Sequence, residues 1–249
     1  MNRKFKINSI LILVLCFFLC GCSNRIDNYL RPDASIFGAI LDIKTNDTVP
    51  TANNTQAFGT GYPDGDLNIY QQDYSSTASG PQGTSYGQDG TYNNLSIYEG
   101  TYKGIPVGAF YSDTVLFTVK GRTRQDFRVS PFLHVTIQIL SVTNSSISIK
   151  YEVRSNDSLQ SVSEAAAWLS PSAGVNRFSW LGSNFNPVDA SSYRDDHSDL
   201  SQDASFTRTF SKLKANSTYY IRAGGVALGN NPQSYWNYSK VLKVQTDIN

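Results

Sequence analysis

The side chains best suited to binding a ligand are aromatic residues near the C-terminus. Tyr235, Trp236 and Tyr238 fall within one short segment, which we expect to be a loop before the last strand. Asparagine and glutamine side chains lie beside them. Sugar rings offer apolar C–H faces and a rim of hydroxyls, which aromatic faces and amides can bind. Trp180, next to Phe178, is a candidate second platform, although each tryptophan could equally cap a sandwich core.

If this segment is extended, alternate side chains point to opposite faces. Tyr235 and Asn237 then share one face, and Trp236 and Tyr238 share the other. One pair can enter the core while the other faces water. The chemistry available to the segment therefore depends on which pair is exposed.

The N-terminus has the pattern of an export signal. Three basic residues precede the apolar run Ile10–Leu19, which is too short to span a bilayer on its own. The run ends in Leu19-Cys20-Gly21-Cys22, which resembles the lipobox of bacterial lipoproteins, with Cys20 in place of the usual small residue. The resemblance implies cleavage after Gly21 and lipid attachment to Cys22, and several acyl chains suffice for stable anchoring. The alternative is an ordinary signal peptide or a signal anchor.

Composition limits the chemistry of the exported part. Of 21 Lys+Arg, three leave with residues 1–21, so 18 face 20 Asp+Glu and the formal charge is −2. Binding to nucleic acid would call for an excess of basic residues, and the exported part has none. Cys16 and Cys20 leave with the signal and Cys22 carries lipid, so no thiol remains for a disulfide, a nucleophile or a metal. No GxSxG, HExxH, Walker or GxGxxG motif is present, and we expect neither an enzyme nor a cofactor.

The histidines and acidic residues give weaker candidates. His134 lies in an expected strand and fits a partly buried strand residue. His197 belongs to the acidic segment 193–203, whose carboxylates could bind calcium. That segment lacks the alternating carboxylates and fixed glycine of a dedicated calcium loop, so a solvated turn is favoured and no metal site is assigned.

The residue palette favours β-structure, because Tyr, Phe, Thr, Ser, Asn and Gly dominate while Glu and Met are scarce. In the first half we expect loops over 44–61 and 75–90. Lys120-Gly121 is expected to join Val115–Val119 and Gln125–Val129 in a hairpin, with five side chains on one buried face: Val115, Phe117, Val119, Phe127 and Val129. The expected strands are 35–43, 67–70, 91–92, 100–107, 115–119 and 125–129.

Motifs in this half resemble the carboxypeptidase-regulatory (transthyretin-like) sandwich. They comprise a strand ending in Gly38-x-Ile40-x-Asp42, then Asp89-Gly90-Thr91-Tyr92, Leu95, and Gly100-Thr101-Tyr102. The resemblance covers about residues 34–130. Asp-Gly is suited to the hairpin turn, and Gly100 lets the chain bend before Tyr102.

The second half follows an expected hinge at Ser130-Pro131-Phe132. Clean alternation over Ile147–Val153 predicts a strand, and the ambiguous segment Ala165–Ser170 is assigned to a strand because it is short and precedes Pro171. Residues 213–223 resemble the E–F corner of fibronectin type III domains, where a tyrosine hydroxyl bonds back to the corner backbone. Tyr219 would be that residue. Strands are also expected at 135–139 and 239–244.

The sequence thus predicts an all-β protein with two Ig-like β-sandwich domains in tandem after a lipoprotein signal peptide. The expected divisions are a signal peptide (1–21), a lipidated tether (22–31), a regulatory-like sandwich (32–131) and a fibronectin-like sandwich (132–249). This combination resembles a family of two-domain outer-membrane lipoproteins of unknown function, encoded beside SusC/SusD-type importers of Gram-negative glycan degraders.

The resemblance implies an outer-membrane location on the cell surface, with the periplasmic face left open. It further implies a glycan-binding or accessory role beside a SusC/SusD-type complex, with polysaccharide or oligosaccharide as the ligand. A structural or protein-interaction module, adhesin-like or docked on the importer, is the alternative.

Overall fold

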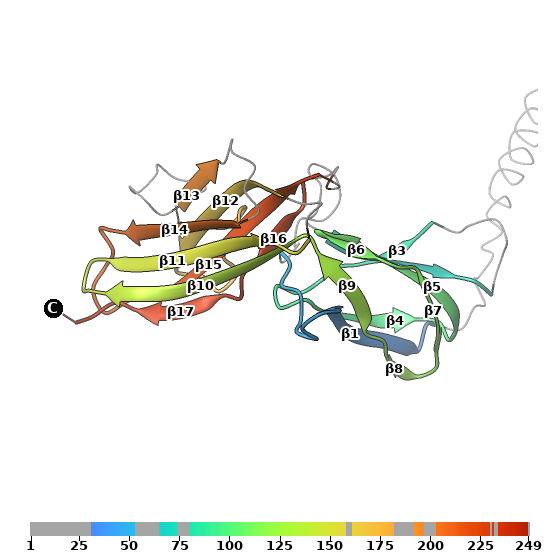
Figure 1. Ribbon diagram of the computed structural model, residues 1–249. Coiled ribbons are helices and arrows are strands. Elements are labelled where there is room, and N and C mark those ends of the chain that lie inside the picture. Colours follow the sequence, from blue (N-terminus) through green and yellow to red (C-terminus); the bar gives the residue numbers. More distant parts are fainter. Residues whose placement is uncertain are drawn as a thin grey trace, which may run out of the picture. The chain divides into compact units, whose positions relative to one another are not determined.

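The computed structural model of the protein describes residues 31–52, 65–73, 80–157, 161–181, 192–196, 203–229, 231 and 234–248. These residues form strands, turns and loops without a helix. Pro32–Asn249 form one compact unit. The all-β fold class expected from the sequence is confirmed, and the strands build two β-sandwiches (Figure 1).

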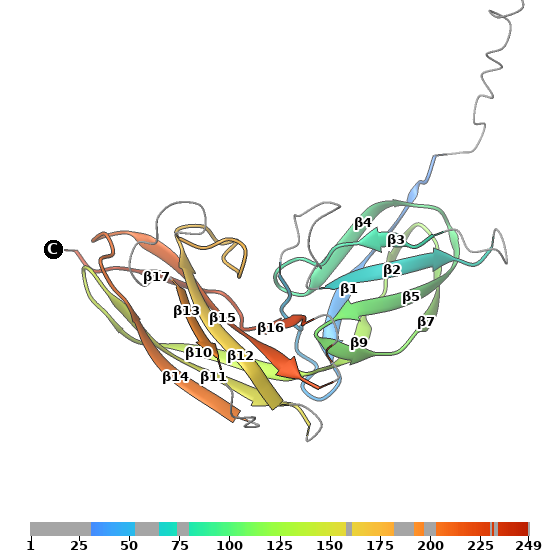
Figure 2. The same cartoon turned by 90° about the horizontal axis from the view of Figure 1, so that it is seen from above.

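The first sandwich contains strands β1 to β9 in two sheets, and in Figure 2 β2 and β5 of one sheet lie in front of β1 of the other. One sheet has the order β4-β1-β9-β6, with β8 also paired to β1, and the other has the order β3-β2-β5-β7. Among the described strand pairs of this sandwich, only β1–β8 and β1–β9 are parallel. The bounds are β1 Ala34–Asp42, β2 Gly65–Gln71, β3 Gln82–Thr84, β4 Thr91–Ile97, β5 Gly100–Gly108, β6 Phe110–Ser112, β7 Val115–Val119, β8 Arg122–Arg124 and β9 Phe127–Pro131.

The expected hairpin between 115–119 and 125–129 is wrong. Strand β7 pairs with β5, whereas β9 pairs with β1 and β6 in the facing sheet. After Gly121, whose φ is +54°, the chain crosses from one sheet to the other. The predicted buried side chains are nevertheless confirmed, because Phe117, Val119, Phe127 and Val129 share one core and Val115 packs against it. They meet across the two sheets instead of along one.

One of the two loops expected in the first sandwich is partly structured. Strand β3 lies within the expected loop 75–90, and part of that loop falls outside the described residues. The Asp89-Gly90 turn forms as predicted: Gly90 has φ +81°, and a Cβ there would lie 2.3 Å from the Val49 carbonyl oxygen. A side chain at position 90 would therefore separate this turn from the loop after β1.

The second sandwich contains β10 to β17. One sheet has the order β10-β11-β14, and the other has the order β13-β12-β15-β16 with β17 also paired to β15. All these pairs are antiparallel. The bounds are β10 Leu133–Val142, β11 Ile147–Ser155, β12 Ser161–Ser170, β13 Ser192–Asp196, β14 Asp203–Phe210, β15 Thr218–Leu228, β16 Trp236–Tyr238 and β17 Leu242–Gln245.

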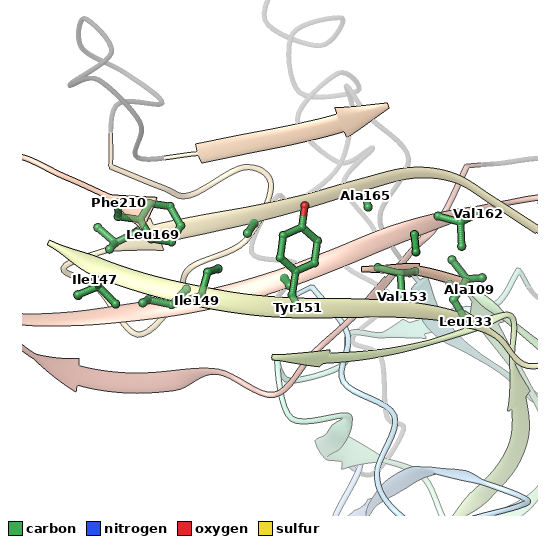
Figure 3. Packing of buried hydrophobic residues seen from close by; sticks show 14 of the residues in the cluster. Ala109, Leu133, Ile147, Ile149, Tyr151, Val153, Val162, Ala165, Leu169 and Phe210 are labelled. Carbon is green, nitrogen blue, oxygen red and sulfur yellow. The ribbon is translucent and has the colours of Figure 1, made fainter. Parts of the chain in front are cut away.

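The inner core of this sandwich lies between its two sheets. Strand β11 alternates buried and half-buried residues from Ile147 to Val153, as its sequence predicts. Figure 3 shows these side chains directed toward Ala165 and Leu169 of β12. Residues 165–170 are a strand, which confirms the assignment made against their helix propensity. Each strand of the core thus contributes every second side chain.

The fibronectin-like corner also forms. The backbone N–H of Lys214 donates a hydrogen bond to the Tyr219 hydroxyl at 3.1 Å. Both Tyr219 and Leu213 are buried in the inner core. The expected tyrosine corner is confirmed, and it fixes the connection from β14 into β15.

The passage from β9 to β10 is closely bonded. Pro131 and Phe132 are buried, and the Asn156 side-chain amide donates to the Pro131 carbonyl at 2.7 Å. The Phe132 N–H donates to the Ala109 carbonyl. The expected hinge at 130–132 is therefore a buried crossing, and separate folding of 32–131 and 132–249 stays a prediction.

Candidate functional site

Strand β12 is apolar on both faces, which is unusual for an antiparallel sheet with one wet side. Ala165, Ala167 and Leu169 point into the inner core. Ala166 and Trp168 point to the opposite face, where they join a second apolar cluster. We call this second group the outer cluster; its buried members are Ala52, Ala166, Trp168, Val175, Val226, Trp236 and Tyr238.

The outer cluster is built on a glycine. Gly224 of β15 pairs with Ala166 of β12 and with Tyr238 of β16. A Cβ on Gly224 would lie 3.0 Å from ring atoms of both Trp168 and Trp236. The two indole rings meet above it, with centroids 5.2 Å apart and planes at 62°. The missing side chain therefore lets both rings pack directly on the sheet.

The segment around Trp236 is a strand and not the expected loop. Because β16 is extended, Trp236 and Tyr238 share the outer face, as alternation predicts, and both are buried at 6% and 3% exposure. Tyr235 packs against the inner core. The Asn237 side chain accepts from the Leu133 N–H at 3.0 Å and donates to the Ala109 carbonyl at 2.9 Å.

The loop after β12 adds exposed aromatic surface to the outer cluster. Asn176 exchanges backbone hydrogen bonds with Ser179, and its side-chain oxygen accepts from the Phe178 N–H at 2.8 Å. This tight turn presents Arg177 and Phe178, the latter 49% exposed. Half-buried Trp180 packs against the outer cluster. The turn is therefore ordered by its own hydrogen bonds before any ligand binds.

These side chains line a cavity of about 560 Å³, which we call the aromatic pocket. Its size is within the range of small-ligand sites. Trp180 and Trp236, both proposed from the sequence, are brought together in it, whereas Tyr235 and Tyr238 are not among its lining residues. The described lining residues are Ser163, Glu164, Ala166, Trp168, Arg177, Phe178, Trp180, Val226, Ser234 and Trp236.

Trp168, Glu164 and Arg177 are among the lining residues that were not proposed from the sequence. Trp168 occupies an alanine-rich run that is compatible with an ordinary core strand. The signal in the sequence is that consecutive residues of this run are all apolar. Because successive side chains of a strand point to opposite faces, both faces would then be apolar and covered. Glu164 lies within β12 and Arg177 in the tight turn after it, and charged residues are common at protein surfaces.

Loops of the first sandwich are bonded to a residue that packs against the outer cluster. Arg222 of β15 is fully buried, and its guanidinium lies 4.3 Å from the Tyr238 ring centroid. It donates hydrogen bonds to the carbonyls of Ser239 at 3.0 Å, Thr51 at 2.8 Å and Gln88 at 3.1 Å. Thr51 and Gln88 belong to loops of the first sandwich. A buried guanidinium needs several such acceptors, and here they tie the two sandwiches together.

A second hydrogen bond joins the first sandwich to the loop that carries the aromatic side chains after β12. The Gln88 side-chain amide donates to the Val175 carbonyl at 2.7 Å. Ala52 of the first sandwich packs into the outer cluster. The first sandwich thus holds one end of the turn that presents Arg177 and Phe178.

Two other cavities lie where loops of the first sandwich meet strands of the second. Their volumes are about 400 and 600 Å³. Among the described residues, each has a single tyrosine in its lining, Tyr238 in one and Tyr220 in the other. Neither offers the pair of contacting tryptophans found in the aromatic pocket.

Other residues proposed from the sequence take no part in this site. His134 is a half-buried strand residue, as expected, with Nε2 2.9 Å from the Asn156 side-chain oxygen. Cys22 and His197 lie outside the described residues, as do the side chains of most of the acidic segment 193–203. Within the described ranges, no three His, Cys, Asp or Glu residues are grouped to hold a metal. No described helix is long and apolar enough to cross a membrane.

Comparisons with known proteins agree with this fold. Residues 36–130 match the family model described as "Protein of unknown function (DUF3823) N-terminal domain". This span corresponds to the first sandwich, where the sequence indicates a regulatory-like domain of a family of unknown function. A comparison with curated protein sequences found no match.

Solved structures extend the likeness to both sandwiches. A crystal structure of a candidate carbohydrate-binding protein from Bacteroides uniformis has 21% identity and a TM-score of 0.70, covering 86% of this chain and 99% of that chain. A DUF3823 family protein from Parabacteroides merdae has 20% identity and a TM-score of 0.66, with the same coverage. At these identities the comparisons show a shared fold.

Proposed function

We propose that the protein is a non-enzymatic lipoprotein that binds carbohydrate through the aromatic pocket. The observation that carries this proposal is the aromatic surface of exposed Phe178 and half-buried Trp180, held on an ordered turn beside Trp236. Aromatic faces bind the C–H faces of sugar rings, and the serines, Glu164 and Arg177 of the lining can bind hydroxyls. The description of the similar Bacteroides uniformis protein as a candidate carbohydrate-binding protein supports the same ligand class.

The proposal includes an outer-membrane anchor at Cys22. It rests on the apolar run followed by Leu19-Cys20-Gly21-Cys22, and on the energy of burying several acyl chains in lipid. A location at the cell surface beside a SusC/SusD-type importer would place the pocket where polysaccharides are captured.

Ligand binding is tested with residues 32–249 in affinity gels containing different polysaccharides. At least one polysaccharide should retard the parent protein. Phe178→Ala and Trp180→Ala should weaken binding by about tenfold or more, equivalent to about 1.4 kcal/mol. Because Phe178 is exposed, its variant should keep the melting temperature of the parent.

The matched control is Phe37→Ala in the first sandwich. Phe37 also lies under an arginine, with the Arg122 guanidinium 4.6 Å from its ring centroid, as Arg177 lies 4.3 Å from that of Phe178. Phe37→Ala should leave retardation unchanged. If no polysaccharide retards the parent, or if Phe37→Ala is as damaging as Phe178→Ala, binding by the aromatic pocket is contradicted, and the protein-interaction alternative gains support.

The anchor is tested by Cys22→Ser in the full chain. The variant should move from the membrane fraction to the soluble fraction and should no longer incorporate labelled palmitate. Cys20→Ser is the control, because a small residue is usual at that place and processing should continue. Full membrane retention and labelling of Cys22→Ser would contradict the proposed anchor.

A further inference from the structure

The charges of the aromatic pocket bear on which saccharides it accepts. Among its described lining residues, Glu164 is the one acid and Arg177 the one base, and Ser163 and Ser234 add neutral hydroxyls. The formal charges of these described lining residues therefore sum to zero. A positive excess in a site attracts an anionic sugar, and a negative excess attracts a cationic one.

The guanidinium of Arg177 places a positive charge beside the aromatic rings that a ligand would contact. Its central carbon lies 4.3 Å from the Phe178 ring centroid and 6.0 Å from that of Trp236. Both distances are within the range of cation–π attraction. An amino sugar would have to displace this cation or approach it closely. The arrangement thus disfavours a positively charged ligand.

Glu164 disfavours a negatively charged ligand in the same way. It pairs with Val226 across β12 and β15, and Val226 pairs in turn with Trp236 on β16. The carboxylate residue and the indole residue are therefore two strands apart, or about 9.6 Å, with Val226 as an apolar floor between them. A uronate or sulfate in this space would lie close to the carboxylate as well as to Arg177.

We infer that the aromatic pocket selects neutral saccharides, with Glu164 and Arg177 binding hydroxyls of one sugar ring. This inference rests on the proposed function. Hydroxyls donate to the Glu164 carboxylate and accept from the Arg177 guanidinium, while the C–H face of the ring contacts Trp180 and Phe178. Hydroxyl groups can serve as donor and acceptor at once, so a ligand with neighbouring hydroxyls can form hydrogen bonds with both charged side chains without a charge of its own.

The test is calorimetric titration of residues 32–249 with four sets of oligosaccharides: neutral, uronate-containing, sulfated and amino-containing. Titrations are made at ionic strengths of about 0.01 M and about 0.15 M, since salt screens charge–charge attraction. A neutral oligosaccharide should bind tightest, with less than about a twofold change between the two salt concentrations. Glu164→Gln and Arg177→Gln should each weaken it by about tenfold, or about 1.4 kcal/mol.

Glu164→Gln should in addition improve binding of the uronate set, because it leaves Arg177 as the one charge among the described lining residues. If a charged oligosaccharide binds the parent more tightly and Phe178→Ala abolishes that binding, the pocket binds carbohydrate but the inferred neutral preference is wrong. Neutral binding that neither charge variant weakens also overturns the inference. If none of the four sets binds, the proposed function itself fails.

Discussion

The two sandwiches differ in what covers their sheets. Among the described residues, the first sandwich has one apolar cluster, which lies between its two sheets. The second has an inner core of the same kind and, on the other face of β12 and β15, the outer cluster. An outer sheet face is normally polar. The difference indicates that this face is covered: partly by Thr51, Ala52 and Gln88 of the first sandwich, and partly, we propose, by a ligand.

The outer face of the opposite sheet shows the ordinary arrangement. On β11, Glu152 lies between Lys150 and Arg154, with a carboxylate oxygen 2.6 Å from a nitrogen of each. These side chains are partly exposed. One outer face of the second sandwich is thus a charged, solvated surface, whereas the other is aromatic. The contrast makes the aromatic face the functional candidate.

The largest expected effect is that of removing the first sandwich. The sequence predicts that 132–249 fold separately, but alone they would leave Arg222 without its Thr51 and Gln88 acceptors. We expect the unfolding free energy of 132–249 to fall by more than about 3 kcal/mol relative to the second half within 32–249, because hydrogen bonds to charged groups contribute about 1.5–3 kcal/mol each. Urea unfolding measures both. Equal midpoints would show that the contacts between the sandwiches contribute little.

Arg222→Met in residues 32–249 tests the same contacts through one side chain. The three carbonyls of Ser239, Thr51 and Gln88 would lose their donor inside the protein, at a cost of about 3 kcal/mol. Arg154→Met, at an exposed position of the same sandwich, is the control and should cost less than about 1 kcal/mol. If the two variants unfold at the same urea concentration, Arg222 is not the main link between the sandwiches.

Gly224→Ala should damage the aromatic face while leaving the inner core intact. The added methyl would push against Trp168 and Trp236, which costs about 2 kcal/mol as overpacking and displaces the wall of the pocket. Both stability and saccharide binding should fall. Gly174→Ala is the control, because its added carbon meets only the Ser172 hydroxyl oxygen at 3.8 Å. A Gly224→Ala variant with unchanged binding would show that the two rings do not shape the pocket.

Tyr219→Phe probes the opposite face of the same strand. It removes the hydroxyl that accepts from the Lys214 N–H and should cost about 1 kcal/mol, measured by urea unfolding. Saccharide affinity should stay within twofold of the parent, since the change is in the inner core. Loss of binding here would mean that the two faces of β15 are coupled, and the separation into core and binding face would fail.

The smallest effect concerns the charged outer face. Hydrogen bonds from Lys150 and Arg154 lower the pKa of Glu152. A lowered pKa in the folded state gives stability that is present above the unfolded pKa of about 4.3 and is lost as pH falls through the folded pKa. Between about pH 5 and pH 3, the parent should therefore lose slightly more stability than Glu152→Gln. Identical pH profiles in urea unfolding would show that this pair of ion contacts adds nothing.

Local patterns predicted local structure well in this protein. The alternation of 147–153 predicted β11, and Leu213 with Tyr219 predicted the corner that the Lys214 hydrogen bond confirms. The hairpin expected at Lys120-Gly121 failed because a turn motif does not specify which sheet the next strand joins. The loop expected at Tyr235–Tyr238 failed because pairing with β15 extends it.

The site itself depended on long-range contacts that no local pattern contains. Arg222 lies 171 residues from Thr51 and 134 from Gln88, and an arginine in a strand is normally expected at the surface. Trp168 meets Trp236 only because Gly224 lies between them on the paired strand. The sequence thus supplied Phe178, Trp180 and Trp236, and the pairing of β12, β15 and β16 together with the loops beside these strands supplied the rest of the pocket.

The central claim is that the aromatic outer face of the second sandwich is a saccharide-binding site. A crystal structure of residues 32–249 with a saturating neutral oligosaccharide tests it most directly. The account predicts a sugar ring against Trp180 and Phe178, with hydroxyls within hydrogen-bond distance of Glu164 and Arg177. An oligosaccharide bound on another surface, with the aromatic pocket empty, would contradict it.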